Sequence, residues 1–558
     1  MSRRLAVLGA TLAAALAAVP AAHASTDDES SFQDDPLLVF GSAGTVDQTL
    51  DTLRSLGVDR IRVSLFWRAV APGGTSKTKP ANFDATDPGA YRQADWYRYD
   101  RLIIAAYTRG ITVNLNVTDP APSWATGNPK RADIEPTYNP SVSEFGAFMK
   151  AAAIRYSGQY AVPATSALVP PAAKPPGGGG FPIPVPPLPK ARAAAVDATQ
   201  EPAGTILPRV DYWSIWNEPN QPGWLTPQWT ATGAHGRYVE AAPRIYRNLL
   251  DAAWSVLQQT GHGKDTILIG DTAPKGLNVV GTTRAIKAMH FIRLLYCLGD
   301  RYHLLRGGRA TQLGCPATPR RAAFRAAHPA LFEATGWAHH PYELTFSPSI
   351  APKDPDFVTI ANLPRLTNGL TRALGAWGRH RRGGGMPLYL TEFGYQTNPP
   401  DPTGVTWSQQ AAYLDQSEFI AYANPNVRTL SQFLLHDDAP GPGGDYGATF
   451  QSGLETNAGA VKPSFSAYRL PIYLPQTTFA RRASLRVWGM LRAAPNGKAQ
   501  QVAVEFRATH GTGWRRLRLL ATDGGRGYLD RRVRLPGSGA VRLDWQGTVS
   551  RSVGVRRR

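Results

Sequence analysis

Short apolar segments rich in β-branched residues alternate with stretches of helical periodicity along most of the chain. The helical stretches at 45–56 and 97–109 are each followed by a glycine, as is common at helix C-termini, and a third covers 142–156. Eight strands are expected between and after such helices, at residues 37–41, 60–65, 111–117, 210–215, 266–270, 336–339, 387–391 and 429–435.

Repeated strand–helix units predict parallel strands joined by right-handed crossovers. Eight of them favour a closed (β/α)8 TIM barrel over an open sheet, and we expect it to span residues 37–475. The alternative is a doubly wound sheet. No Gly-rich phosphate loop follows the first predicted strand, which argues against it.

Two segments depart from this alternation. Residues 161–204 are crowded with prolines and contain an unbroken glycine run at 177–180. Because the strand pattern resumes at 210, we interpret this segment as an insertion within the barrel domain. Residues 477–558 show alternating strand patterns separated by Gly and Pro turns, which predicts a small all-β, sandwich-like C-terminal domain.

The first 24 residues have a charged start, an apolar middle and an Ala22-His23-Ala24 end. This pattern is typical of a secretory signal peptide, so we expect cleavage after Ala24 and a secreted, extracellular protein. Residues 25–36 are acidic and Ser-rich, and we expect a disordered lead there. No later apolar run is long enough to predict a transmembrane segment.

Composition adds little beyond a folded protein: 42% of residues are hydrophobic and 18% charged. The net charge of +20 accompanies no zinc finger, RNP motif or basic helix. We therefore expect no nucleic-acid partner, although weak contact with anionic cell-wall polymers is compatible with the charge. The protein is expected to be a monomer.

The two cysteines, Cys297 and Cys315, flank a loop-like stretch and belong to no C-x-x-C motif. In an oxidising compartment a single close pair favours a loop-closing disulfide over a metal or redox site. The histidines are scattered and no H-E-x-x-H motif occurs, so we expect neither a metal nor another cofactor.

Two glutamates end predicted strands three strands apart. Glu218 lies in the segment WSIWNEPN (213–220) and Glu392 in LYLTEFGY (388–395). Residues at the C-terminal ends of barrel strands line one common mouth, so both carboxyls should face one pocket. Two carboxyls on either side of a glycosidic bond are what its hydrolysis requires. A lone glutamate after a strand is usually a helix cap or a solvated charge; the pairing favours catalysis.

Here the chain resembles glycoside hydrolase clan A, whose members carry a W-x-x-x-N-E-P type motif after strand four and a T-E-x-G type motif after strand seven. Both occur, as Asn217-Glu218-Pro219 and Thr391-Glu392-Phe393-Gly394. The resemblance covers about residues 37–474 and is closest to the cellulase-like family five or the xylosidase-like family thirty-nine. It implies an O-glycosyl hydrolase that retains anomeric configuration, with Glu218 as general acid/base, Glu392 as nucleophile and carboxyls about 5 to 5.5 Å apart.

Further positions match the clan residue by residue. The resemblance implies that Arg62 keeps the nucleophile ionised, that Asn217 binds the sugar 2-hydroxyl and that Tyr342 donates to the nucleophile. His340 either adjusts the acid/base or binds sugar, or is a structural histidine. Many clan members place a tryptophan on the eighth strand, whereas this chain reads QFLLHDD at 432–438. The candidate stacking platforms that remain are Trp67, Trp124 and Trp224.

The function predicted is therefore a secreted, retaining glycoside hydrolase that cleaves O-glycosidic, β-linked bonds in oligo- or polysaccharides. The competing hypothesis is a non-catalytic glycan- or cell-wall-binding protein that keeps the barrel. Such a protein would have lost a carboxylate or its supporting residues, and all of these are present. The sugar, the endo or exo mode of action and the choice between hydrolysis and transfer stay open.

Overall fold

The computed structural model describes residues 25, 28–164, 201–232, 237–381, 385–447 and 449–558. Eight parallel strands close into a barrel, because the last strand pairs with the first. In order around the barrel they are β1 (Glu29–Gln33), β2 (Arg60–Phe66), β3 (Thr112–Thr118), β4 (Tyr212–Ile215), β7 (Thr266–Thr272), β8 (Gly336–His339), β9 (Leu388–Phe393) and β10 (Val427–Phe433). The predicted TIM-barrel fold is thus confirmed.

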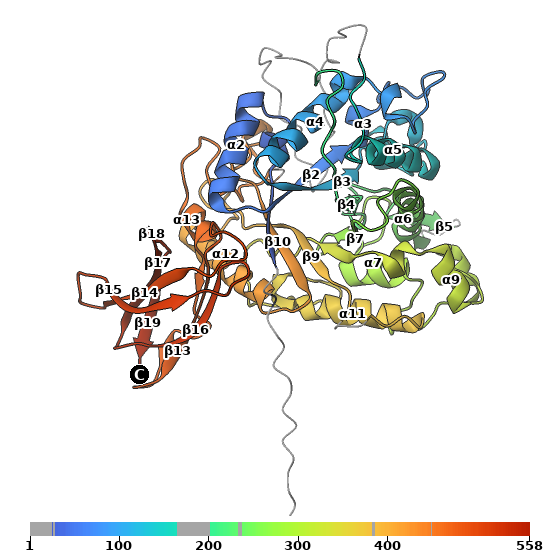
Figure 1. The fold of residues 1–558 in the computed structure, drawn as a ribbon. Coiled ribbons are helices and arrows are strands. Elements are labelled where there is room, and N and C mark those ends of the chain that lie inside the picture. The colour runs from blue at the N-terminus through green and yellow to red at the C-terminus, as the bar shows by residue number, and fades with distance from the viewer. Residues whose placement is uncertain (1–24, 26–27, 165–200, 233–236, 382–384, 448) are drawn as a thin grey trace, which may run out of the picture.

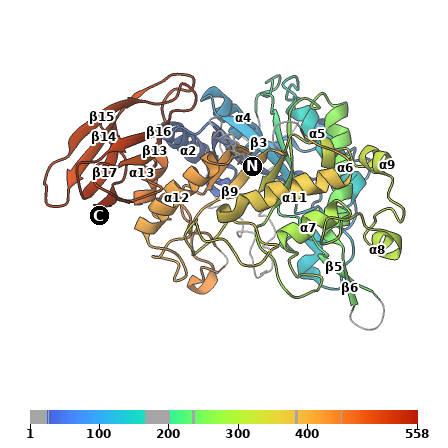
Figure 2. The same cartoon turned by 90° about the horizontal axis from the view of Figure 1, so that it is seen from below.

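Helices surround the barrel (Figures 1 and 2). The longer ones are α2 (Ala43–Leu56), α4 (Gln93–Thr108), α5 (Val142–Arg155), α6 (Ala242–Gln259), α7 (Ala288–Leu295), α11 (Leu363–Ala376) and α12 (Trp407–Tyr422). Shorter ones are α1 (Asp35–Leu38), α3 (Trp67–Val70), α8 (Gly307–Gln312), α9 (Arg321–Ala327), α10 (Ala330–Glu333) and α13 (Pro463–Arg469). Short 3-10 helices cover Pro88–Ala90, Ser123–Ala125, Ala132–Thr137, Ile360–Asn362 and Pro442–Gly444. Two antiparallel strands, β5 (Trp229–Thr232) and β6 (Arg237–Glu240), follow β4.

The start of the barrel differs from the sequence prediction. The strand expected at 37–41 is wrong, and so is the disordered lead at 25–36, because β1 occupies Glu29–Gln33. Asp34 accepts a hydrogen bond from the backbone N–H of Leu37 and caps α1, which contains a proline in its first turn. The apolar residues after it therefore become helical. The polar residues of β1 misled the prediction because several face the barrel interior, where Gln33 is buried.

The other seven predicted strands lie within two residues of their observed bounds. The predicted signal peptide at 1–24 lies outside the described residues. So does 165–200, the larger part of the predicted insertion at 161–204. Among the described residues, no helix has both the length and the apolar character needed to cross a membrane.

The C-terminal domain consists of two sheets packed face to face. The smaller has the order β11 (Ile472–Tyr473), β13 (Ser484–Met490), β16 (Tyr528–Arg534). The larger has the order β12 (Thr478–Phe479), β19 (Val553–Arg557), β17 (Gly539–Trp545), β14 (Gln501–Ala508), β15 (Arg515–Ala521), and β18 (Thr548–Val549) pairs with β17. Leu, Val and Phe side chains from both sheets form one core, as in a sandwich. Because β11 pairs with β13, the domain begins before the predicted residue 477.

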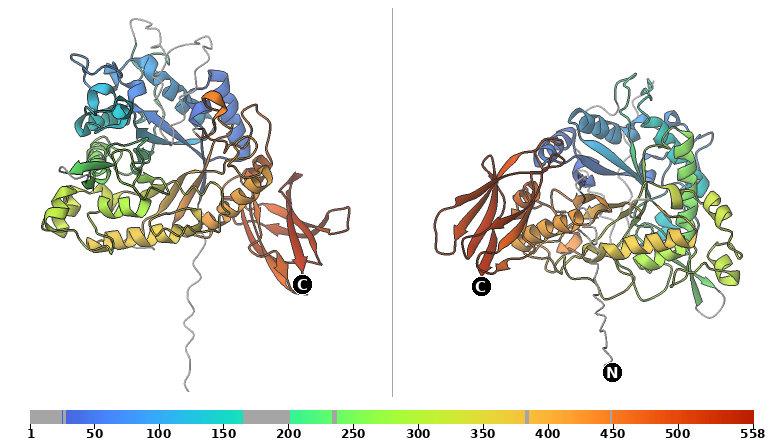
Figure 3. Two further views of the ribbon diagram at one scale, coloured as in Figure 1. Left: turned by 180° about the vertical axis from the view of Figure 1, so that it is seen from behind. Right: turned by 60° about the horizontal axis from the view of Figure 1, so that its bottom comes forward.

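The small sheet packs against α12, which places the C-terminal domain to one side of the barrel in every view (Figures 1 and 3). Trp488, Met490 and Tyr528 form an apolar cluster with Tyr422 and Phe419 of α12. Two arginines of the domain also reach buried carboxylates of that helix: Arg492 binds Glu418 at 2.6 Å, and Arg551 binds Asp415. These contacts fix the domain to the barrel wall.

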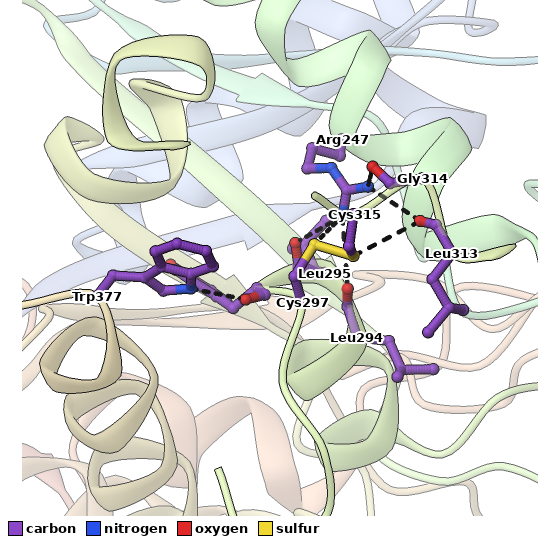
Figure 4. The surroundings of a disulfide bond; sticks show 9 residues. Arg247, Leu294, Leu295, Cys297, Leu313, Gly314, Cys315 and Trp377 are labelled. Carbon is purple, nitrogen blue, oxygen red and sulfur yellow. Dashed lines mark hydrogen bonds between the residues drawn. A yellow bond between two sulfur atoms is a disulfide. The ribbon is translucent and has the colours of Figure 1, made fainter. Parts of the chain in front are cut away.

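Cys297 and Cys315 form a disulfide, as predicted. Beside it lies the buried guanidinium of Arg247, which donates to the carbonyl oxygens of Leu295, Leu313 and Gly314 (Figure 4). Burial lowers the pKa of Arg247 to about 10. The disulfide and the arginine together hold both ends of the intervening loop against α6.

We predict that the double variant Cys297→Ala/Cys315→Ala loses about 3 kcal/mol of unfolding free energy. The reason is that the bond closes a loop with a sequence separation of 18 and so restricts the unfolded chain. Chemical denaturation of the variant and of the oxidised wild type measures the difference. Reduced wild-type protein is the control and should match the variant. Equal midpoints for the variant and the oxidised protein would contradict the prediction.

Candidate active site

Two carboxyls meet at the C-terminal mouth of the barrel. Glu218 lies three residues beyond β4, and Glu392 is the second-to-last residue of β9. A carboxylate oxygen of each lies within 4.8 Å of the other. Their side chains are 13% and 11% exposed, so both reach the surface of an otherwise buried cluster. The two predicted glutamates are therefore neighbours in space, although 174 positions separate them.

Glu392 accepts hydrogen bonds from two donors and has a third polar group nearby. Nη1 of Arg62 lies 2.7 Å from its Oε1, and the hydroxyl of Tyr342 lies 3.3 Å from its Oε2. Nδ1 of His340 is 3.5 Å from the same Oε2. Burial and the nearby carboxylates raise the pKa of the Tyr342 phenol well above its usual value, so Tyr342 acts as a donor here.

The fully buried Arg62 connects this carboxylate to the rest of the cluster. Nη1 also donates to Gln33 at 2.6 Å, and Nη2 donates to Asn217 at 2.7 Å and to Asp271 at 3.3 Å. Burial alone would lower the pKa of Arg62, but the Asp271 and Glu392 carboxylates outweigh it, and the pKa rises. Arg62 is thus a permanent cation at the base of the mouth.

His340 links the second glutamate to the same cluster. Its Nδ1 lies 2.9 Å from Oε1 of Glu218, and its Nε2 lies 3.3 Å from Oδ1 of Asp271. Burial lowers the pKa of His340, whereas the Glu392, Asp271 and Glu218 carboxylates raise it, and the result is a pKa of about 9. At neutral pH His340 is an imidazolium, and both of its nitrogens donate.

Glu218 carries a raised pKa. Burial is the main cause, His340 opposes it, and the negative charge of Glu392 adds to it. Its backbone conformation is unusual as well, with φ of 34°. The backbone N–H of Glu218 donates to the carbonyl of Asp271 at 2.9 Å, which fixes the strained turn against the end of β7. A buried carboxyl with a raised pKa is suited to donate a proton.

Asp271 is a charged member of the cluster that sequence reasoning missed. Its Oδ1 accepts hydrogen bonds from Thr391 at 2.6 Å, from Arg62 and from His340. Burial alone would raise its pKa, but Arg62 and His340 lower it overall. The preceding Gly270 has φ of 105°, and a Cβ there would lie 2.4 Å from the Trp337 ring, so only glycine lets the strand end turn in this way.

The structure brings six predicted residues together at the mouth: Arg62, Asn217, Glu218, His340, Tyr342 and Glu392. It also adds residues that the sequence did not single out, namely Gln33, Asn116 and Asp271. With its side-chain amide oriented to suit its neighbours, Asn116 accepts from Arg62 and donates to the carbonyl of Trp216. Polar residues at alternate positions of β1 and β3 were the available signal.

Of the three tryptophans predicted to stack on sugar, the structure contradicts one and leaves two untested. Trp67 is fully buried at the start of α3 and stacks on Phe148, so its prediction as a sugar platform is wrong. The chain turns into a helix directly after β2, which places this ring between the barrel and its helices. Trp124 and Trp224 are partly buried and stay predictions. On the eighth strand Phe433 packs edge-on against Tyr342, at the position where the sequence lacks a tryptophan.

The residues Glu218, His340 and Glu392 are close enough together to share a metal ion. The donor set suits a cation poorly, however, because an imidazolium has no lone pair to offer and Arg62 lies beside the same carboxylate. The cluster is better matched to a neutral polar ligand that approaches two carboxyls.

The fold and site define a (β/α)8 barrel with a close carboxyl pair at its C-terminal mouth. No protein-family model matches the chain, and no curated protein matches it. It is similar to the solved structure of a family 39 glycoside hydrolase from Bacteroides cellulosilyticus WH2, with 13% identity over 92% of this chain and 79% of that chain and a TM-score of 0.44.

Two further solved structures are similar to this chain. A monomeric β-xylosidase from Caulobacter crescentus CB15 shows 14% identity over 92% of this chain and 95% of that chain, with a TM-score of 0.42. GH5_18 from Streptomyces cattleya, in complex with GlcNAc, shows 16% identity over 82% and 84%, with a TM-score of 0.39. The chemistry of this chain is argued below from its own side chains.

We predict that Asp271→Asn lowers the pKa of His340 by about one unit or more, because a carboxylate that faces Nε2 is replaced by a neutral amide. An NMR titration of the His340 ring measures this pKa. The matched control is Glu455→Gln, which removes the carboxylate 2.8 Å from His436 and should leave His340 unchanged. An unaltered His340 titration in Asp271→Asn would show that Asp271 does not stabilise the imidazolium.

Proposed function

We propose that this protein is a secreted, retaining glycoside hydrolase that cleaves β-linked oligo- or polysaccharides, with Glu392 as nucleophile and Glu218 as general acid/base. The observation that carries the proposal is the asymmetry of the carboxyl pair. Glu392 is held by the guanidinium of Arg62, whereas Glu218 is a buried carboxyl with a raised pKa. Two close carboxyls in different environments can divide the roles of nucleophile and acid.

The separation of the carboxyls supports retention. An inverting enzyme needs about 6.5–9.5 Å between them to admit a water molecule, and a retaining enzyme about 5–5.5 Å. One oxygen of Glu218 and one of Glu392 lie within 4.8 Å of each other, which is nearer to the separation of a retaining pair than to that of an inverting pair. Direct attack by the carboxylate is therefore the favoured first step.

In that step an oxygen of Glu392 bonds to the anomeric carbon while the bond to the leaving oxygen breaks, and Glu218 gives that oxygen its proton. In the second step Glu218, now a carboxylate, takes a proton from water. The water oxygen bonds to the anomeric carbon, and Glu392 is released. Transfer to another sugar follows the same course with a sugar hydroxyl in place of water.

The supporting residues fit both steps. The His340 imidazolium donates to Glu218 and so stabilises the carboxylate that forms after proton donation. Arg62 donates a hydrogen bond to Oδ1 of Asn217. The amide N–H groups of Asn217 are therefore left to donate to a sugar hydroxyl. Tyr342 keeps Glu392 oriented.

The alternative is a non-catalytic glycan-binding protein. Such a protein has no use for a buried acid beside a carboxylate, since burying charged groups costs stability unless they are put to use. Secretion, a monomeric state and contact with anionic cell-wall polymers belong to the same proposal and are supported by the sequence alone.

We predict opposite azide products from two variants. Glu218→Ala should lower kcat/KM by about 10²–10⁴ on poor leaving groups, keep more activity on activated aryl β-glycosides and yield a β-glycosyl azide. Glu392→Gly should form no glycosyl-enzyme and yield an α-glycosyl azide, because azide then replaces the missing nucleophile. NMR of the products identifies the anomers.

The matched control is Glu343→Gln, which alters another carboxyl of the loop after β8 and should retain activity without azide. Wild-type turnover followed by NMR should give net retention. Inversion at the anomeric carbon would refute the assignment of Glu392, and equal activity of Glu218→Ala on all leaving groups would refute that of Glu218.

We also predict that the exported protein begins at Ser25, because the Ala22-His23-Ala24 end marks the cleavage site. Intact-mass analysis of the protein recovered from the medium measures the new N-terminus. A variant with Ala24→Pro serves as the control and should block processing. An uncleaved mass for exported wild-type protein would contradict the prediction.

A further inference from the structure

The positive charge of the protein is concentrated in its C-terminal domain. Residues 477–558 contain eighteen Arg and Lys against four Asp and Glu, a net charge of +14 out of +20 for the whole chain. The preceding 476 residues therefore carry only +6. A uniform arginine bias would spread the charge in proportion to length. The net positive charge of this domain is therefore larger than its share of the chain would give.

Most of these cations lack an acidic partner. Five arginines of the domain form ion pairs: Arg486, Arg492, Arg526, Arg542 and Arg551. Three of the five reach carboxylates of the barrel and fix the domain in place. Among the described residues, the remaining thirteen basic side chains have no carboxylate within ion-pair distance.

Six of the unpaired arginines lie on two neighbouring edge strands. β15 is the edge of the large sheet, β16 is the edge of the small sheet, and the two lie side by side. Each carries the pattern Arg-Arg-x-Arg with an apolar residue at x. We name this surface the basic edge, and all six of its side chains are exposed: Arg515, Arg516, Arg518, Arg531, Arg532 and Arg534.

Protection of an exposed strand edge explains only part of this arrangement. A charged side chain or two is enough to prevent edge-to-edge pairing. Six guanidiniums at the neighbouring edges of two packed sheets concentrate positive charge on one part of the surface, which favours the binding of an anion. Two acidic side chains of the same sheets are already engaged, since Asp530 binds Arg486 and Glu505 binds Arg542.

We propose that the basic edge binds a carboxylated polysaccharide. Guanidinium groups bind carboxylates through paired hydrogen bonds, and a row of them can follow a polymer with regularly spaced charges. That the polymer is a glycan rests on the proposed function of the barrel. Nucleic acid is the alternative polyanion, and within β15 and β16 the one aromatic side chain, Tyr528, is buried and cannot stack on bases.

The test measures binding of the full-length protein to sodium polygalacturonate, with its neutral methyl ester, duplex DNA and vesicles of anionic phospholipid as comparison probes. The wild type should bind the polyuronate, lose affinity as salt rises and not bind the ester. Arg531→Gln/Arg532→Gln/Arg534→Gln should raise the Kd at least about tenfold, as should the matching triple variant of Arg515, Arg516 and Arg518.

The control for charge is Lys130→Gln/Lys264→Gln/Arg301→Gln, which removes the same charge from exposed positions of the barrel and should change the Kd less than about twofold. Thermal unfolding and turnover of an aryl glycoside should match the wild type in all three variants. Equal weakening by edge and control variants, or tighter binding of DNA or vesicles than of polyuronate, would overturn the proposal. Absent turnover with intact polyuronate binding would instead refute the hydrolase function alone.

Discussion

The buried guanidinium of Arg62 is the interaction on which the mouth of the barrel depends. A cation without solvent is tolerated only when anions and hydrogen-bond acceptors surround it, and Arg62 has Glu392, Asp271 and Asn217 within hydrogen-bond distance. These partners come from three strand ends far apart in the sequence. The requirement to satisfy one charge therefore aligns the ends of the strands and, with them, the two glutamates.

A second cation extends this arrangement. His340 and its neighbour His339 are both fully buried, yet burial lowers the pKa of His339 to about 3, whereas carboxylates raise that of His340 to about 9. His339 faces Thr272 and a backbone carbonyl, and His340 faces Glu218 and Asp271. Alternation along the strand end thus separates a neutral structural histidine from a charged one, and places the charge between the carboxyls.

The sequence predicts the features that depend on local patterns. Seven strands, the disulfide and both glutamates follow from periodicity, spacing and motifs, because each has a local signature. The first strand does not, because its buried polar residues, such as Gln33, are dictated by Arg62 on the next strand. Asp271 and the burial of Trp67 were equally invisible, since both depend on which side of a strand end a residue faces after the barrel closes.

The barrel and the C-terminal domain differ in how they use arginine, because it pairs within the fold in the barrel and is largely unpaired in the C-terminal domain. In the barrel Arg62 and Arg247 are buried, and both terminal nitrogens of each guanidinium donate to partners within the fold. In the C-terminal domain, Arg492 and Arg551 are used likewise to bind buried carboxylates of α12, which holds the sandwich against the barrel. The arginines of the basic edge form no ion pair with a described carboxylate, so their charge is left to solvent ions or to a partner from outside the molecule.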